Sequence, residues 1–206
     1  MMRQDASQAG FTIIETLVAL TVLSLILIAA SAGLLQIGRT YYKGVITTRT
    51  QDINRAALDQ ISQALQFSGR NVAIERVDPL DESSNVTALC VGSNRFTPFR
   101  ENQLDGTNYG LYKDQRPSGQ CSPFDPSSEP ADGEELLGEN MRLTRFNITP
   151  FGDPAETYNV VVWVAYGEDD VFDIDGNNRY SCKGLSIGSE FCAIAELSTT
   201  ITRRIL

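Results

Sequence analysis

A long uncharged stretch near the N-terminus constrains this chain more than any other feature. No residue between positions 16 and 38 is charged, and most of these 23 residues are apolar. As an α-helix, which rises about 1.5 Å per residue, the stretch would be about 34 Å long. That length is enough to cross a hydrocarbon core of about 30 Å. The sequence therefore predicts a membrane-spanning helix close to the N-terminus.

The boundary in front of this stretch is sharp. Residues 1–10 are polar and end at Gly10, and Phe11 opens the apolar sequence FTIIETLVAL. Glu15 lies just inside the apolar segment, where a carboxylate in or near lipid costs about 3 kcal/mol. A buried carboxylate and a buried ammonium are each unfavourable alone and tolerable together. Glu15 is therefore a candidate functional residue whose expected partner is a positive charge.

The sequence GFTIIE and the apolar run behind it resemble the processing and methylation site of type IV prepilins and pseudopilins. The resemblance covers residues 8–38. It implies that the prepilin peptidase, a membrane-embedded aspartyl peptidase, cleaves after Gly10 and that the new amino terminus, Phe11, is then methylated. It also implies that Glu15 pairs with the positive N-terminus of a neighbouring subunit during assembly.

An ordinary secretory signal peptide is the main alternative for this segment, because Ala30, Ser31 and Ala32 form a small-residue cleavage site. Three features argue against it. Glu15 stands at the start of the apolar run, the leader lacks a net positive charge, and the run is longer than the usual stretch of about 7 to 15 residues. The prepilin interpretation is therefore favoured.

The helical pattern continues beyond Gly38. Small or apolar side chains recur at spacings of four and three, which is typical of one face of an amphipathic helix. These residues are Ile46, Thr50, Ile53, Ala57, Ile61 and Leu65. The other face is predicted to be polar and to include Asn54, and Ser68 and Gly69 provide a helix stop. One helix is thus expected over residues 11–67, with its first half in the membrane or filament core.

Short strand patterns separated by turns fill most of the remaining chain. Residues 159–166, NVVVWVAY, form the strongest candidate strand, and residues 192–205 form another with alternating apolar side chains. These two strands are expected to pair in one antiparallel sheet against the helix. The other candidate strands are residues 86–91, 109–112 and 141–148, and residues 117–133 form the clearest surface loop.

The predicted fold is therefore α+β, with a long N-terminal helix packed on an antiparallel β-sheet and with long loops stapled by disulfides. The predicted organisation is a leader peptide at residues 1–10, a transmembrane or filament-core helix at 11–38, and an extracytoplasmic head domain at 39–206.

Four cysteines lie beyond the apolar run, at Cys90, Cys121, Cys182 and Cys192, and the chain has no histidine. Zinc-finger and Cys/His nucleophile arrangements therefore lack their usual second partner. An even count downstream of a membrane anchor favours disulfides in an oxidising compartment. Three pairings are possible, and proximity along the chain favours Cys182 with Cys192 and Cys90 with Cys121. Four buried free thiols in a reducing cytoplasm are the alternative.

The segment between the two strongest strands is rich in oxygen-bearing side chains. The candidate calcium ligands are Asp169, Asp170, Asp173, Asp175 and Asn177. An EF-hand is excluded, because the glycine falls at Gly176 instead of the sixth loop position and no glutamate ends a twelve-residue loop. Some pseudopilins hold calcium in a loop near the C-terminus, and the resemblance keeps this possibility open. The other interpretation is an acidic, solvated turn capped by the bridge from Cys182 to Cys192.

Charge and composition limit the classes of function. The chain has 26 acidic and 17 basic residues and a net charge of −9, so direct binding to nucleic acid is not expected. Acidic clusters are the only support for a membrane-tethered enzyme, and catalysis by paired carboxylates needs a spatial convergence that a sequence does not show. We therefore expect a protein that is not an enzyme.

The leading functional hypothesis is a minor pilin of a type IV pilus, a structural filament subunit for pilus initiation or the tip, in adhesion, twitching motility or DNA uptake. The alternative is a pseudopilin of a type II secretion or competence system. Expected partners are the prepilin peptidase, the inner or cytoplasmic membrane and other pilin subunits, which bind through the N-terminal helix. Before assembly the protein is expected to be a single-pass membrane protein, and afterwards part of an extracellular pilus or a periplasmic pseudopilus.

Overall fold

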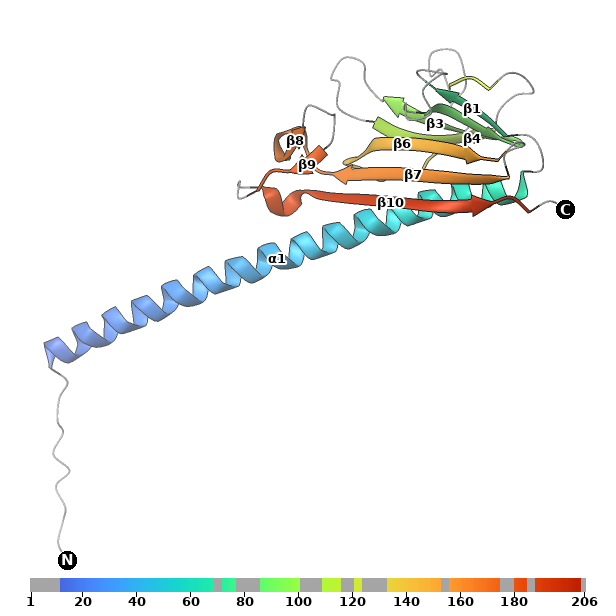
Figure 1. Ribbon diagram of the computed structural model, residues 1–206. Coiled ribbons are helices and arrows are strands. Elements are labelled where there is room, and N and C mark those ends of the chain that lie inside the picture. Colours follow the sequence, from blue (N-terminus) through green and yellow to red (C-terminus); the bar gives the residue numbers. More distant parts are fainter. Residues whose placement is uncertain are drawn as a thin grey trace, which may run out of the picture. The chain divides into compact units, whose positions relative to one another are not determined.

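The computed structural model combines one long helix with antiparallel strands (Figure 1). It describes residues 12–68, 72–76, 86–100, 109–115, 121–123, 133–152, 156–174, 180–184 and 188–204. The helix α1 spans Ile13–Phe67. The strands are β1 (Val72–Arg76), β2 (Val86–Val91), β3 (Asn94–Arg100), β4 (Tyr109–Gln115), β5 (Glu134–Glu135), β6 (Met141–Phe151), β7 (Thr157–Tyr166), β8 (Phe172–Ile174), β9 (Tyr180–Cys182) and β10 (Ala193–Thr202). Two short 3₁₀ helices are η1 (Asp169–Val171) and η2 (Ser189–Phe191).

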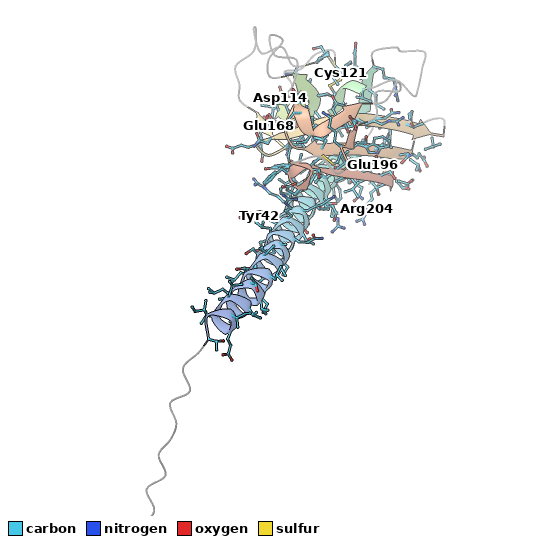
Figure 2. All side chains as sticks on the ribbon, turned by 90° about the vertical axis from the view of Figure 1, so that its left-hand side faces the viewer. Tyr42, Asp114, Cys121, Glu168, Glu196 and Arg204 are labelled. Atoms are coloured by element: carbon cyan, nitrogen blue, oxygen red, sulfur yellow. A yellow bond between two sulfur atoms is a disulfide. The ribbon has the colours of Figure 1, made fainter. Side chains whose placement is uncertain are left out.

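The chain divides within α1 into two compact units, Met1–Tyr41 and Tyr42–Leu206, and we call the second unit the head. In the first unit, the apolar side chains of α1 project on all sides and are exposed (Figure 2). The hydroxyl groups of Thr16, Thr21 and Ser24 donate to carbonyl oxygens three or four residues earlier in the helix. These polar groups are therefore satisfied within α1 itself, which makes the segment compatible with a lipid environment.

Among the described residues of the head, antiparallel ladders form three sheets. The order β10-β7-β6 makes one sheet and the order β1-β2-β3-β4-β5 makes another, while β8 and β9 form a small hairpin. β7 is the central strand of the first sheet and pairs along its whole length with β10. The predicted pairing of these two strands is confirmed, although β7 begins earlier and β10 is shorter than the sequence pattern indicated.

One hydrophobic core joins the second half of α1 to both large sheets. Ala57, Leu58, Ile61 and Leu65 are buried on the helix. They share a cluster with buried side chains of β2, β3, β4, β6, β7 and β10. Examples, in the same order, are Leu89, Phe96, Leu111, Phe146, Val160 and Ile201. Burial of this apolar surface is the main force that holds the helix to the sheets. The predicted α+β class, with a helix packed on antiparallel strands, is confirmed.

Asn54 corrects the predicted polar face of α1. Its side chain is fully buried, and Nδ2 donates to the carbonyl oxygens of Val162 at 3.0 Å and Ala195 at 2.9 Å. These carbonyls belong to β7 and β10, so one amide fixes the position of the helix against two strands. Asn54 lies four residues after Thr50 and four before Leu58, and spacing alone would have placed it in the buried stripe. Its polar residue type led to the wrong assignment.

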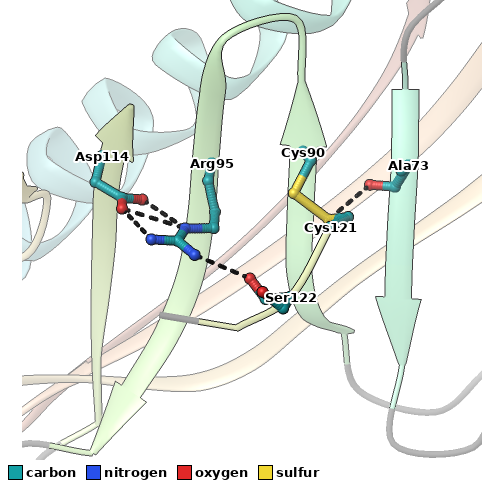
Figure 3. Close-up of a disulfide and its surroundings, with 6 residues drawn as sticks. All are labelled: Ala73, Cys90, Arg95, Asp114, Cys121 and Ser122. Atoms are coloured by element: carbon teal, nitrogen blue, oxygen red, sulfur yellow. Dashed lines mark hydrogen bonds and ion pairs between the residues drawn. A yellow bond between two sulfur atoms is a disulfide. The ribbon is translucent and has the colours of Figure 1, made fainter. Parts of the chain in front are cut away.

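A buried ion pair and a disulfide stabilise the five-stranded sheet (Figure 3). Arg95 of β3 is 3% exposed and lies opposite Asp114 of β4, and its Nε donates to the Asp114 carboxylate at 3.0 and 3.2 Å. A guanidinium nitrogen of Arg95 also donates to the Ser122 carbonyl oxygen at 3.3 Å. The disulfide from Cys90 to Cys121 places Ser122 at this site. The buried guanidinium of Arg95 thus receives its hydrogen-bond acceptors from two other parts of the chain, β4 and the segment after Cys121.

Candidate processing and assembly site

Thr12 and Glu15 form the start of α1. The backbone N–H of Glu15 donates to the Thr12 hydroxyl at 3.3 Å and to the Thr12 carbonyl oxygen at 3.1 Å. A threonine that caps the helix, followed three residues later by glutamate, is the sequence pattern of a capping box. The pattern was present in the sequence but was not used in the prediction. The Thr12 side chain thus caps the backbone of Glu15, and the spacing of the two residues matches a capping box.

Both predicted processing residues, Gly10 and Phe11, lie outside the described residues. Glu15 lies in the first turn of α1 and is exposed. A carboxylate in the first turn interacts favourably with the positive end of the helix dipole. The described part of the site therefore presents an accessible negative charge at the beginning of an apolar helix.

Within the part of the chain that the structure describes, α1 is long and apolar enough to cross a membrane, by length and composition. The large apolar side chains of its described residues 13–41 are exposed, and Ile13, Leu25 and Leu34 are among the most exposed. Large exposed apolar surfaces mark sites of contact with lipid or protein. The segment therefore has the properties of a membrane anchor.

The structure joins Cys90 to Cys121 and Cys182 to Cys192. These are the two pairings that proximity along the chain favours. Cys192 is buried with Val171 and Phe172 in a small second core, where Cys182 and Tyr180 pack against them. The bridge thus links β9 to the residue that precedes β10. It stabilises the hairpin at the end of the sheet from which β10 starts.

Two residues of the acidic segment, Asp169 and Asp170, already contact other side chains of the head. Asp169 forms an ion pair with Arg142 of β6, which is buried and also donates to the Gly167 carbonyl oxygen at 2.9 Å. The Arg142 guanidinium lies over the Phe172 ring, 4.8 Å from its centroid. The carbonyl oxygen of Asp170 accepts a hydrogen bond from Lys183 at 2.6 Å. No local sequence pattern predicted that the Asp169 carboxylate would neutralise the charge of a buried arginine.

Among the residues that the structure describes, no group of three or more aspartate, glutamate, cysteine or histidine side chains is arranged to hold a metal ion. Asp173 is exposed in β8, whereas Asp175 and Asn177 lie outside the described ranges. The calcium hypothesis therefore stays a prediction.

Comparison with known protein families matches residues 5–31 to the prokaryotic N-terminal methylation motif. No curated protein and no solved structure matches the chain. The matched motif is the signature of type IV prepilins and pseudopilins, and it includes Gly10, Phe11 and Glu15. The chain therefore carries this signature at residues 5–31, and its head has an α+β fold. The resemblance stated from the sequence is confirmed.

Proposed function

We propose that this protein is a minor pilin of a type IV pilus, a structural subunit that helps to initiate the filament or forms its tip. The observation that carries the proposal is the methylation motif at residues 5–31, which overlaps the first part of an exposed apolar helix. The motif points to a structural subunit of the pilin class and not to an enzyme. Membrane anchoring before assembly also fits this helix and the motif.

In this proposal, the apolar surface of the first half of α1 contacts lipid before assembly and neighbouring subunits after it. Before assembly, residues 13–38 contact lipid, where an apolar helix with internally bonded hydroxyl groups is stable. In the filament, the first halves of α1 from neighbouring subunits pack on one another, and the apolar side chains are removed from lipid without being exposed to water. The exposed state of this surface in the isolated chain supports such a role.

Glu15 sets the stagger between subunits in this mechanism. Cleavage after Gly10 creates a positively charged amino group at Phe11, four residues before the carboxylate of Glu15. In a bundle of apolar helices, the carboxylate of one subunit and the amino group of the next are each unfavourable when unpaired. Their pairing therefore favours one axial offset between neighbouring helices over the others.

Processing is tested by intact-mass analysis of the protein from its natural host. The mature chain should begin at Phe11 and carry one methyl group on its amino terminus. Substitution of Gly10 by a bulkier residue should leave uncleaved precursor in the membrane. A mature chain that begins at Gly33 would instead show cleavage by signal peptidase after Ala32, and would contradict the prepilin assignment.

The role of Glu15 is tested with two variants that separate its charge from helix capping. Glutamine fits the capping box as glutamate does, whereas valine does not. Glu15→Gln and Glu15→Val should both insert, be cleaved and fold, and both should enter filaments poorly because the ion pair is lost. Incorporation is measured by immunoblotting of sheared filaments. If Glu15→Gln enters filaments as well as wild type and only Glu15→Val fails, the residue acts through the helix start and the ion-pair mechanism is wrong.

A pseudopilin of a secretion or competence system is the second candidate, because the methylation motif is the signature of both groups. The two functions share the processing and assembly chemistry described above and differ in the machinery that they serve. The genes that flank this one separate them: a pilus motor and adhesin genes support the minor pilin, whereas a secretion operon supports the pseudopilin.

A further inference from the structure

Large apolar side chains are exposed at both ends of the head. The paired registers of β6, β7 and β10 place the start of β10 beside the start of β6, and the end of β10 beside the end of β6. Phe191 precedes the start of β10, whereas Phe151 ends β6. Since ten strand residues separate the two ends, these phenylalanines are about 30 Å apart along the sheet.

Three apolar side chains gather at the Phe191 end, and we call Tyr42, Val45 and Phe191 the interfacial patch. The rings of Tyr42 and Phe191 have centroids 6.4 Å apart, yet the residues are 57% and 49% exposed. Tyr42 and Val45 are three residues apart on α1 and therefore share one face of the helix. The patch joins the helix to the η2 turn of the head.

The η2 turn holds Phe191 firmly in an exposed position. Its backbone N–H donates to the Gly188 carbonyl oxygen at 2.9 Å, and Gly188 adopts the left-handed conformation with a φ of 99°. The next residue, Cys192, is buried and disulfide-bonded to Cys182. The backbone is thus held on both sides of Phe191, whose side chain stays half-exposed beside the small core that buries Val171 and Phe172.

The position of Tyr42 along α1 indicates what covers the patch. Tyr42 comes four residues after Gly38, the end of the uncharged run, and therefore lies about 6 Å farther along the helix axis. The headgroup regions of a bilayer extend about 5 to 7 Å beyond the hydrocarbon core on each side. Tyrosine is enriched at this depth because its ring is apolar and its hydroxyl is polar. Lys43 follows Tyr42 directly, and a long basic side chain at such a depth extends its charge toward the polar headgroups.

We propose that the interfacial patch is a lipid-contact surface, through which the head rests on the headgroup layer of the bilayer that α1 crosses. Phe191 enters the boundary between headgroups and acyl chains next to Tyr42. The inference rests on the membrane anchoring in the proposed function and adds a second, peripheral contact made by the head. That contact restrains the orientation of the subunit at the membrane surface before it joins a filament.

The test uses tryptophan fluorescence of the full chain in phosphatidylcholine vesicles whose lipids carry bromine near the headgroup. Zwitterionic lipid suits a chain with a net charge of −9, because anionic lipid would repel the head. Trp163 is the one tryptophan in the sequence, and Trp163→Phe provides a background without it. In that background, Phe191→Trp and Tyr42→Trp should both lose fluorescence to the brominated lipid. Phe151→Trp, an exposed site at the other end of the head, is the matched control and should not.

A fourth reporter, Leu25→Trp, lies within the apolar run and measures insertion of α1 independently. If Leu25→Trp is quenched and Phe191→Trp is quenched no more than Phe151→Trp, the lipid-contact surface is overturned and the membrane anchor stands. If Leu25→Trp is not quenched, the membrane anchoring in the proposed function fails and the inference fails with it. Quenching of Phe191→Trp that is absent at one chain per vesicle would show that the lipid contact depends on neighbouring copies and would likewise overturn the proposal.

Discussion

The two halves of α1 have the same secondary structure and opposite environments. Ile26 in the first half is 59% exposed, whereas Ile61 in the second half is completely buried. In the first half, the hydroxyl groups of Thr21 and Ser24 donate to the backbone of the helix itself, while the second half donates through Asn54 to two strands. A helix in a protein is stabilised mainly by what packs on its apolar face. The second half finds that partner within the chain, whereas the apolar side chains of the first half stay exposed.

This difference means that folding and assembly depend on different regions of the molecule. The head holds its own hydrophobic core, both disulfides and a buried ion pair, and its stability depends on those contacts. The apolar side chains of residues 13–38 contribute little to that stability in the isolated chain and remain available for other surfaces. Substitutions in the two regions should therefore have different consequences.

The largest effect is expected from the buried ion pair of the head. Asp114→Leu removes the carboxylate that faces Arg95 and leaves a guanidinium buried between β3 and β4. The free energy of unfolding should fall by about 3–5 kcal/mol, measured by chemical denaturation of the full chain in detergent micelles. The double variant Arg95→Met/Asp114→Leu should regain most of the loss, because no buried charge is left unpaired. A single variant as stable as wild type would show that the head does not depend on this contact.

A matched pair of isoleucine substitutions tests the two halves of α1 directly. Ile61→Ala should lower the free energy of unfolding of the head by about 2–5 kcal/mol, because it opens a cavity in the core. Ile26→Ala removes the same atoms from an exposed position on the same helix and should leave the unfolding of the head unchanged. Both are measured by circular dichroism during denaturation in micelles. Equal losses in the two variants would contradict the division between the halves.

The smallest effect is expected from calcium at the acidic segment. Thermal unfolding of the head should be the same with calcium, with magnesium at equal ionic strength and with a chelator, because Asp169 is already paired with Arg142. Calcium bound only by the folded state would add about 2.7 kcal/mol at a hundredfold excess over Kd. A shift with calcium alone that is lost in Asp173→Ala and Asp175→Ala would establish a metal site there and contradict the plain acidic turn.

Several strands were missed because their stability depends on partners that are distant in sequence. β3, with the sequence NRFTPFR, contains a proline and two arginines and does not resemble a buried strand. It forms because β2 and β4 pair with both of its edges and because Asp114 neutralises Arg95. β1, β8 and β9 are only three to five residues long, and a pattern of that length carries little periodic signal.

The sequence by itself determined the features that depend on local spacing. The uncharged run and the continuing spacing of apolar residues predict α1, the GFTIIE sequence identifies the processing motif, and the strongest strands are visible as β-branched or alternating segments. Only the tertiary structure decided which polar residues are buried. Asn54, Arg95 and Arg142 look like surface residues in the sequence, since polar and charged side chains are rarely buried without a partner. Their partners lie 19 to 141 residues away along the chain, and only folding brings them together.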